Sequence, residues 1–436
     1  MPGDRRPRRG GPYLTRQPQP PEQRPPATLR RTRHQEQMAT RNPEVPRDKR
    51  QGQSGGLFFT SLQMVHWRNF HGQVDIPLAP RVFLLGPNAS GKSNVLDALR
   101  FLRDTADKGL QAAIGSRGGM GAIRSLHARR PPGFTLAVTV GNRNQPEQWK
   151  YSLQVRSHPQ KHVPEVVAER VTDAQGRQVL RRPKREDKDD PDRLRQTHLE
   201  QVVANQKFRP LTEFLTSIRY LHIVPQLMRD LDRSAGRRND PFGADFLEAV
   251  AATPQRTRDA RLRKISQALQ IAIPQLQDLT LEQDEGGHWH LQVRFVHWCK
   301  RPAKQDERAF SDGTLRLIGL LWSLAEKGGP LLLEEPELGL HTALVSRLPS
   351  LMTRLYRRSP RQLLITTHSP HLLNDPGIGL DEVHLLKPGP QGTEMIPATE
   401  HQPTASLCSE DGQLSLGEIL MPAVAPEQVD RFHMAD

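Results

Sequence analysis

One stretch constrains the fold of this chain more than any other, and it runs from Arg81 to Leu102, RVFLLGPNASGKSNVLDALRFL. A short apolar run is followed by a glycine-containing loop, and then by apolar residues at helical spacing: Val95, Leu96, Leu99 and Leu102. This order predicts a buried strand, a tight loop and a helix. The loop matches the Walker A pattern, G-x-x-x-x-G-K-[ST], whose backbone N–H groups cradle phosphate oxygens. The stretch therefore predicts a nucleotide site.

Each residue type in this loop has a physical role. Gly86 and Gly91 allow backbone conformations that side chains would obstruct. Lys92 offers a positive charge to the β- and γ-phosphates, which also makes it a candidate catalytic residue, and the Ser93 hydroxyl can ligate Mg²⁺. The following helix points its positive end at the same anion. We predict that ATP and Mg²⁺ bind here and that the nucleotide-binding residues are Gly86, Pro87, Asn88, Ala89, Ser90, Gly91, Lys92, Ser93 and Asn94.

The length of 436 residues suits one large or two moderate domains. The formal net charge is +14, but residues 1–56 contribute more than half of it, with 13 Lys and Arg against 5 Asp and Glu. This tail also holds ten prolines and almost no apolar periodicity, so we predict that it is disordered. It is interpreted as a solvated extension, or as the product of a start codon placed too far upstream; the alternative is a basic arm that holds DNA or RNA.

The chain has two cysteines, Cys299 and Cys408, which lie far apart and form no C-x-x-C pair. This spacing argues against a disulfide framework and against a cysteine-based zinc site, and it suits a reducing cytosol. No apolar run approaches the roughly 18 residues needed to span a bilayer. We therefore expect a cytoplasmic protein without a membrane partner.

Alternating apolar residues predict an antiparallel lobe around the loop. From Leu57 the pattern predicts a hairpin that leads into the strand before the loop. Three later stretches, Phe134–Val140, Trp149–Val155 and Val163–Val171, predict a small antiparallel sheet that completes this lobe. Residues 107–133 are rich in glycine and arginine, and their composition fits both a surface loop and a basic loop that faces DNA.

The middle of the chain mixes charged, helical and strand patterns. Arg181 to Arg195 is a charged run, which predicts a solvated loop. The interval before the next motif, about 220 residues, holds no sustained heptads, so we predict no long coiled-coil arm. Further predictions are a strand at Ile218–Val224, helices at Phe246–Val250 and Leu262–Ile273, and a hairpin of Leu279–Gln283 and Trp289–Phe295.

Three motifs in the second half carry chemistry that complements the loop. Ser311 and Gly313 precede an apolar helical pattern, so a hydroxyl and N–H groups lie at a helix N-terminus, where an anion is favoured. The run PLLLEEPE ends in Glu334 and Glu335, which a parallel strand would deliver to the carboxyl edge of a sheet. A further apolar run, LLITTHSP, places His368 at a strand end in the same way.

The segments around the loop resemble the start of the RecF/SMC/ABC-type ATPases, especially the RecF-like and OLD-type branch. The resemblance rests on Arg68-Asn69-Phe70 at the end of the first strand and on GPNASGKSN in the loop. It extends to the three later motifs, which follow in the order of the ABC signature, Walker B and the switch histidine. It implies an α/β P-loop NTPase fold: an ABC-type ATPase head with parallel central strands, an antiparallel N-terminal lobe and a compact lid insertion.

The resemblance assigns catalytic and metal roles to the second-half residues. Glu334 stands where an aspartate is usual and would hold Mg²⁺ through water, together with Ser93. Glu335 would be the general base that orients the attacking water. His368 would contact the γ-phosphate or that water. His341, at the position of the D-loop, is expected to be structural and not catalytic.

The resemblance also implies contacts beyond the loop. Ser311 and Gly313 would contact a γ-phosphate that is bound to a different subunit, and His71 would lie near the base. Only about 65 residues follow Pro370, with a predicted hairpin of Glu382–Leu386 and Glu394–Ile396, so no Toprim nuclease domain is expected. Any nuclease activity would then come from a partner.

These patterns predict the domain organisation. Residues 1–56 form the tail, 57–180 the N-terminal ATPase lobe, 181–305 the charged loop and lid, 306–400 the C-terminal ATPase lobe, and 401–436 a C-terminal tail. The expected reaction is Mg²⁺-dependent hydrolysis of ATP, with ATP joining two copies of the chain.

The sequence leaves two biological uses open. One is a DNA-associated ATPase in genome maintenance, with ATP-driven dimerisation that clamps duplex DNA. The other is a sensor or scaffold of a phage-defence module, whose nucleotide state controls a separately encoded effector protein. A transporter role is disfavoured, because the chain has no membrane segment and its motifs resemble the DNA-repair branch more closely.

Overall fold

The computed structural model describes residues 56–125, 133–230, 239–296, 303–401 and 414–425. The chain divides into residues 1–54 and 55–436, and all that follows concerns the second unit. The tail that we predict to be disordered lies outside the described residues, apart from Gly56, and so do Cys299 and Cys408.

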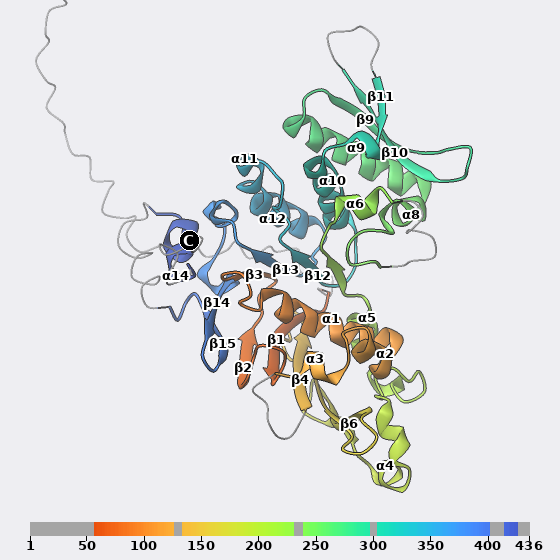
Figure 1. Ribbon diagram of the computed structural model, residues 1–436, viewed down its shortest axis with the longest axis vertical. Coiled ribbons are helices and arrows are strands. Elements are labelled where there is room, and N and C mark those ends of the chain that lie inside the picture. The colour runs from red at the N-terminus through yellow and green to blue at the C-terminus, as the bar shows by residue number, and fades with distance from the viewer. Residues whose placement is uncertain (1–55, 126–132, 231–238, 297–302, 402–413, 426–436) are drawn as a thin grey trace, which may run out of the picture. The chain divides into compact units, whose positions relative to one another are not determined.

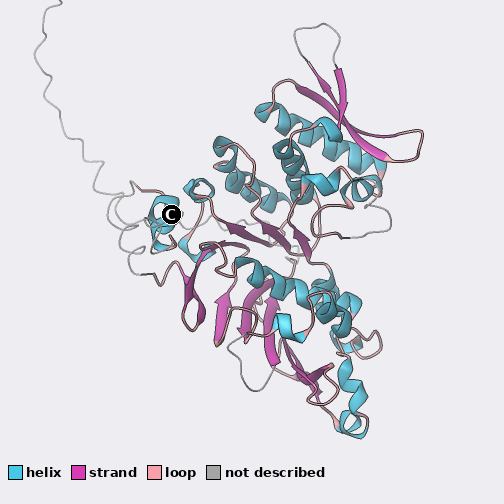
Figure 2. Ribbon diagram, in the orientation of Figure 1, coloured by secondary structure: helices cyan, strands magenta, loops and turns pink. Residues whose placement is uncertain are grey.

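A six-stranded sheet with mainly parallel strands includes β3, the strand before the loop (Figure 2). Its strand order is β15-β14-β3-β13-β12-β8, in which only the edge strand β15 runs antiparallel to its neighbour. The predicted parallel central strands, including the strand before the loop, are confirmed. The strands are β3 (Arg81–Leu85), β8 (Arg219–Leu221), β12 (Leu331–Glu334), β13 (Leu363–Thr367), β14 (Val383–Gly389) and β15 (Gly392–Pro397).

A second six-stranded sheet is antiparallel throughout, in the order β2-β1-β4-β5-β6-β7. It confirms the predicted hairpin and the predicted antiparallel sheet of the first lobe. Its burial alternates along β4, because successive side chains point to opposite faces of a sheet. The strands are β1 (Phe58–Val65), β2 (Gln73–Pro77), β4 (Gly133–Gly141), β5 (Trp149–Ser157), β6 (Pro164–Asp173) and β7 (Gln178–Arg182).

Helix α1 (Lys92–Lys108) packs between these two sheets (Figure 1). Its buried residue Leu99 belongs to one hydrophobic cluster with Leu62 of β1 and Leu84 of β3. Phe83, the neighbour of Leu84, belongs instead to the cluster on the other face of the parallel sheet, as the two-residue period of a strand requires. The helix that follows the loop is therefore held on both sides, and its N-terminus is fixed at the sheet edge.

The glycine- and arginine-rich segment after α1 contains helices α2 (Leu110–Gly115) and α3 (Met120–Ile123), and is not purely a loop. Arg117 lies between these helices and pairs with Asp97 and Asp104 of α1, each at 2.9 Å. Its side chain is buried and satisfied, so it does not form a basic surface. Residues 126–132 lie outside the described part of the chain.

The prediction of a solvated loop over Arg181 to Arg195 is wrong in part. The segment contains α4 (Arg185–Asp189) and a 3-10 helix, η1 (Pro191–Arg195). Arg182 is buried, since it pairs with Asp187 at 2.8 Å and with Glu169 of β6 at 3.2 Å. A count of charges could not show that part of this run neutralises a buried acid.

The chain between β8 and β12 forms a further hydrophobic cluster, separate from the two on the faces of the parallel sheet. In it, α9 and α10 pack with a three-stranded sheet of order β11-β10-β9. The hairpin of β9 and β10 confirms its prediction. The predicted helix at Leu262–Ile273 begins earlier than expected, and the predicted strand at Ile218–Val224 is shorter. The elements are α6 (Pro225–Met228), α8 (Phe246–Ala251), α9 (Gln255–Ala272), β9 (Leu276–Gln283), β10 (Trp289–Phe295), β11 (Ala303–Asp306) and α10 (Asp312–Ala325).

The remaining helices cover the sheets. Helix α14 carries the buried Leu420 and contacts the 3-10 helix η4. Helix α5 packs against α1. Their bounds are α5 (Arg209–Thr216), α11 (Thr342–Val345), α12 (Leu348–Arg358) and α14 (Leu416–Ala423), and the 3-10 helices are η2 (Gln206–Phe208), η3 (Glu307–Ala309), η4 (Pro370–Asn374) and η5 (Leu380–Glu382).

Candidate nucleotide site

The loop between β3 and α1 requires glycine at both ends. Gly91, the N-cap of α1, has φ of 97°, in the left-handed region that favours glycine. A Cβ added there would lie 2.2 Å from the Nδ2 atom of Asn69. A Cβ added at Gly86 would lie 2.7 Å from the carbonyl oxygen of Leu386. Close packing against two other segments therefore fixes the loop in the form that the sequence predicts.

Lys92 folds back over the loop. Its Nζ donates hydrogen bonds to the carbonyl oxygens of Gly86 and Pro87, both at 2.9 Å. Burial lowers the pKa of Lys92 to about 8, and the carboxylates of Glu335 and Glu334 oppose this shift. The present partners of this ammonium group are neutral carbonyl oxygens. A phosphate would bind the group more strongly than these carbonyls do, because hydrogen bonds between charged groups are stronger than those to neutral groups.

Ser93 and Glu334 meet, as predicted for the metal-binding pair. Ser93 Oγ donates to Glu334 Oε1 at 2.5 Å, and the hydroxyl of Tyr220 donates to Oε2. Hydroxyl and carboxylate oxygens are the ligand types that Mg²⁺ takes, so these residues fit the ion. Within the described ranges no three His, Cys, Asp or Glu residues gather to hold a metal alone. Mg²⁺ would then share its coordination with phosphate and water, as it usually does.

Glu335 and His368 also meet. Glu335 Oε1 lies 2.8 Å from His368 Nε2, and both side chains are partly exposed. Burial and the charge of Lys92 lower the pKa of His368, while Glu335 opposes the shift. Glu335 has φ of 44°, a left-handed conformation that is uncommon for a residue with a side chain. Its N–H donates to the Thr366 hydroxyl at 3.1 Å, which helps to hold this conformation at the strand end.

Sequence reasoning missed a supporting role for Glu337, the third acid of this motif. Glu337 is buried, and its Oε1 accepts hydrogen bonds from Thr367 Oγ1 at 2.5 Å and from the backbone N–H of His368 at 3.2 Å. Burial raises its pKa. The residue therefore fixes the strand end that carries His368. Its place two residues after Glu335 was the available signal.

Asn69 joins the loop to the last strand of the sheet. Its Nδ2 donates to the carbonyl of Ser90 at 3.0 Å and to Thr393 Oγ1 at 2.6 Å, and its Oδ1 accepts from Asn94 at 2.6 Å. Thr393 lies on β15, more than 300 residues along the chain, so no sequence signal connects it to the loop. The ring of the nearby His71 packs against His66, with centroids 5.3 Å apart.

The signature residues lie elsewhere on the same chain. Ser311 is the N-cap of α10 and accepts from the N–H of Thr314 at 3.2 Å, as its motif predicts. A Cβ added at Gly313 would lie 2.5 Å from the carbonyl oxygen of Gly339, in the segment after the paired acids. In the described part of the chain, no hydrogen bond joins Ser311 or Gly313 to the loop. His341 caps α11, and its ring accepts from Ala343 N–H at 3.2 Å.

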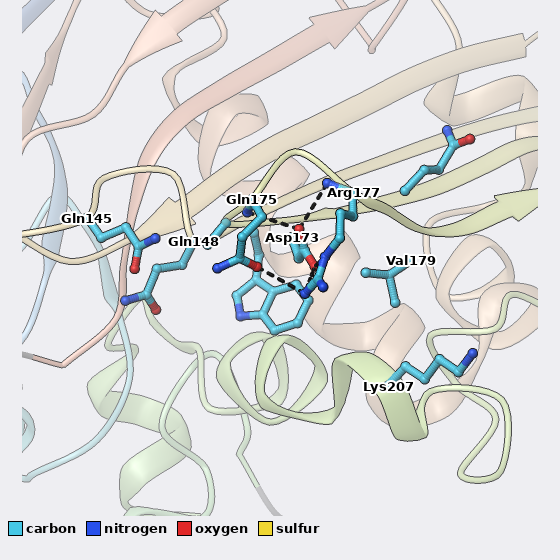
Figure 3. Close-up of a pocket in the computed structure, with 10 residues that line it drawn as sticks. Gln145, Gln148, Asp173, Gln175, Arg177, Val179 and Lys207 are labelled. Atoms are coloured by element: carbon cyan, nitrogen blue, oxygen red, sulfur yellow. Dashed lines mark hydrogen bonds and ion pairs between the residues drawn. The ribbon is translucent and has the colours of Figure 1, made fainter.

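A separate polar hollow, of about 610 Å³, lies at the far strands of the antiparallel sheet (Figure 3). Its acid Asp173 is already bound to Arg177 at 2.8 Å. The hollow shares no residue with the loop or the paired acids, whereas a smaller pocket is lined by Glu334 and Glu335. It is lined by Gln145, Gln148, Trp149, Asp173, Ala174, Gln175, Arg177, Gln178, Val179 and Lys207.

A family model matches residues 81–374, from β3 through the switch strand, and is described as "AAA domain, putative AbiEii toxin, Type IV TA system". The matched range covers more than half of the chain. The chain belongs to this AAA-domain family. Membership agrees with a P-loop ATPase that binds nucleotide at the site described above.

Other similarities of this AAA-domain chain concern SMC proteins. The chromosome partition protein Smc of a Synechococcus strain is 40% identical over 58 residues, which are 13% of this chain and 5% of that protein. A solved Smc head bound to the C-winged helix domain of ScpA has a TM-score of 0.50 and 15% identity, over 78% of this chain and 97% of that one. The SMC head domain from Thermotoga maritima has a TM-score of 0.42 and 15% identity, over 78% and 98%.

The first of these solved structures supports the fold, and the predicted fold of an SMC/ABC-type ATPase head is confirmed. The RecF-like and OLD-type branch stays a prediction, as do the roles of the individual site residues. In the described ranges, no helix is long and apolar enough to cross a membrane.

Proposed function

We propose that this AAA-domain ATPase binds ATP with Mg²⁺ in the loop Gly86–Asn94 and hydrolyses it. The observation that carries the proposal is the convergence of three separate strand ends on the loop. Two contacts support it: Ser93 meets Glu334, the proposed metal ligands, and Glu335, the proposed base, meets His368. A chance Gly-rich turn would not gather these groups.

Each residue of the candidate site would have a separate role in the reaction. Lys92 and the backbone N–H groups of the loop would bind the phosphates, and Ser93 and Glu334 would hold Mg²⁺, which lowers the cost of negative charge on the transferred phosphoryl group. Glu335 would orient the attacking water and accept its proton, while His368 holds the Glu335 carboxylate in place and faces the same water. Catalysis of this kind is positioning and electrostatics.

A second copy of the chain would complete the site. Ser311 and Gly313 make no hydrogen bond to the loop of their own chain, yet they present a hydroxyl and the N-terminus of a 14-residue helix. Such a helix end favours an anion. ATP bound to one protomer would therefore join it to the signature of its partner, and hydrolysis would separate the two. In this proposal residues 57–180 and 306–400 are the two ATPase lobes and 181–305 the lid.

Two biological roles are proposed for this cycle of ATP binding, dimerisation and hydrolysis. The Smc similarity and the basic charge support a DNA-associated role, in which the ATP-joined dimer holds duplex DNA. The family description, which names a type IV toxin–antitoxin system, supports the second: a sensor or scaffold whose ATP state controls a separately encoded effector protein in phage defence.

The test compares wild type with Glu335→Gln. The variant should bind ATP, turn over at least about 100-fold more slowly, and accumulate as a dimer by light scattering, because the base is lost while the binding groups remain. Glu285→Gln, which changes an exposed acid in the turn after β9, should behave as wild type. A Glu335→Gln protein that stays monomeric in saturating ATP would contradict the shared site.

Duplex DNA separates the two roles. Steady-state turnover is measured with and without DNA at low and at moderate salt. Stimulation that disappears as salt rises would support the DNA-associated role, since contacts to phosphates are sensitive to salt. Turnover that ignores DNA at every salt concentration would support control of a protein effector.

A further inference from the structure

Tyr220 reaches the proposed metal site from the edge strand of the parallel sheet. It lies on β8, opposite Leu332 of β12 in the parallel pairing. Because side chains alternate along a strand, Leu332 and Glu334 point to the same face, and Tyr220 packs against the cluster on that face. This is the face that α1 covers, where Ser93 lies. The register therefore brings the phenol to the carboxylate of Glu334.

Both carboxylate oxygens of Glu334 have a hydroxyl donor. Ser93 Oγ donates to Oε1 at 2.5 Å and the Tyr220 hydroxyl donates to Oε2. The Tyr220 ring is itself held, because the Arg100 guanidinium of α1 lies over it at 5.0 Å from the ring centroid. The phenol is thus a fixed donor, while Ser93 is exposed.

The length of the Glu334 side chain decides whether its carboxylate reaches the Tyr220 hydroxyl. A glutamate has one methylene more than the aspartate that is usual here, and so one more rotatable bond to restrain. Shortening it would withdraw the carboxylate from the phenol by about 1.5 Å, one C–C bond. The tyrosine and the glutamate therefore fit each other as a pair.

We propose that Tyr220 is a positioning residue, which holds Oε2 of Glu334 so that the carboxylate stays beside Ser93, where these two residues would hold Mg²⁺. The inference rests on the proposed function, since it concerns the same site. A ligand carboxylate that is fixed by a hydrogen bond loses less freedom when it binds the ion, and such outer partners raise metal affinity.

The experiment uses Tyr220→Phe, which removes the hydroxyl and keeps the ring under Arg100. Calorimetry gives ATP affinity in EDTA and in Mg²⁺, and turnover is followed as Mg²⁺ is titrated. The Mg²⁺ concentration for half-maximal turnover should rise about 10-fold. ATP affinity in EDTA should stay unchanged, and saturating Mg²⁺ should restore the turnover rate. A merely structural tyrosine would not give this rescue by the metal.

Tyr151→Phe is the matched control, because the Tyr151 hydroxyl also donates to a glutamate, Glu169, at 3.2 Å but in the antiparallel sheet. It should lower thermal stability and leave the Mg²⁺ titration unchanged. For Tyr220→Phe, an unchanged titration would overturn the inference, and so would an equal loss of affinity with and without Mg²⁺ or a failure to fold. A wild-type protein that binds no ATP would instead overturn the proposed function.

A double-mutant cycle sharpens the test. Glu334→Asp withdraws the carboxylate, so adding Tyr220→Phe to that variant should change the Mg²⁺ titration by less than about twofold. The same full effect of Tyr220→Phe in both backgrounds would show that the phenol does not act through Glu334.

Discussion

Two tyrosine–glutamate pairs, one in each six-stranded sheet, have the same chemistry in different surroundings. In the antiparallel sheet, Tyr151 donates to Glu169, whose side chain has 0% exposure. Glu169 also accepts from Arg182 and from the backbone N–H groups of His198 and Leu199. Burial raises the pKa of Glu169, and the arginine and the backbone donors oppose the rise. This carboxylate has a full set of donors and no room for a ligand.

In the parallel sheet, Tyr220 donates to Glu334, which is partly exposed. Its donors are two neutral hydroxyls, and within the described residues no basic side chain forms an ion pair with it. Three more ionisable groups, Lys92, Glu335 and His368, lie around the same loop. A buried acid that is paired with an arginine makes that arginine necessary for stability, whereas an acid that meets only hydroxyls at a sheet edge is left able to bind a cation.

Removing Arg182, the arginine beside Glu169 in the antiparallel sheet, should produce the largest change in the free energy of unfolding. Arg182→Ala leaves Glu169 buried without its cation, and Asp187 loses its 2.8 Å contact and keeps the longer one, to Arg193 at 3.7 Å. We expect a loss of about 3–5 kcal/mol in the free energy of unfolding, measured with urea at neutral pH. ATP affinity, measured without urea, should not change, because Arg182, Glu169 and Asp187 make no contact with the loop Gly86–Asn94.

Arg177→Ala is the matched control for that loss. Arg177 also pairs with an acid, Asp173, at 2.8 Å, but its side chain is 75% exposed. Exposed pairs contribute little, so the urea midpoint should stay that of wild type. Equal losses for Arg182→Ala and Arg177→Ala would contradict the distinction between the buried cluster and an ordinary surface pair.

Lys92→Ala should produce the opposite pattern. ATP affinity by calorimetry should fall about 100-fold, since charged hydrogen bonds to phosphate are lost. Stability without nucleotide should not fall, because burial already disfavours the charge on Lys92 and lowers its pKa to about 8. Undiminished ATP binding would show that the loop does not bind the nucleotide. A large loss of stability would show that Lys92 has a structural role like that of Arg182.

The sequence predicted most of the candidate nucleotide site, because strand–loop–helix and paired acids after an apolar run are local patterns. The strand before the loop, the helix from Lys92 and the strand that ends at Glu334 all lie where the patterns place them. The contact between Ser93 and Glu334 followed from the rule that parallel strands share a carboxyl edge, which also brings His368 to that edge. The direct contact between Glu335 and His368 was not predicted.

The missed features depend on pairings that no local pattern contains. Tyr220 meets Glu334 only because β8 pairs with β12 in one register, and Thr393 meets Asn69 only because β15 folds back to the loop. The charged run from Arg181 was misread for the same reason. Its composition is that of a solvated segment, and the buried partner of Arg182 lies on a strand earlier in the chain.

A buried histidine away from both tyrosine–glutamate pairs offers the smallest and last test. Each region contains a histidine whose pKa is lowered, His198 beside Arg182 and His368 beside Lys92. His384, on β14, is 1% exposed, and burial lowers its pKa to about 4 from 6.5. The folded state therefore favours neutral His384, and its contribution is present at neutral pH.

As pH falls below about 6.5 the unfolded chain binds a proton that the folded chain does not, so stability falls until about pH 4. Between pH 7 and pH 5 this group should remove about 2 kcal/mol from the free energy of unfolding. His384→Leu should flatten that part of the slope, as urea unfolding at the two pH values would show. If the slope is unchanged in His384→Leu, the acid sensitivity belongs to the histidines of the two compared regions. Arg182→Ala would then alter it, since the charge of Arg182 contributes to the lowered pKa of His198.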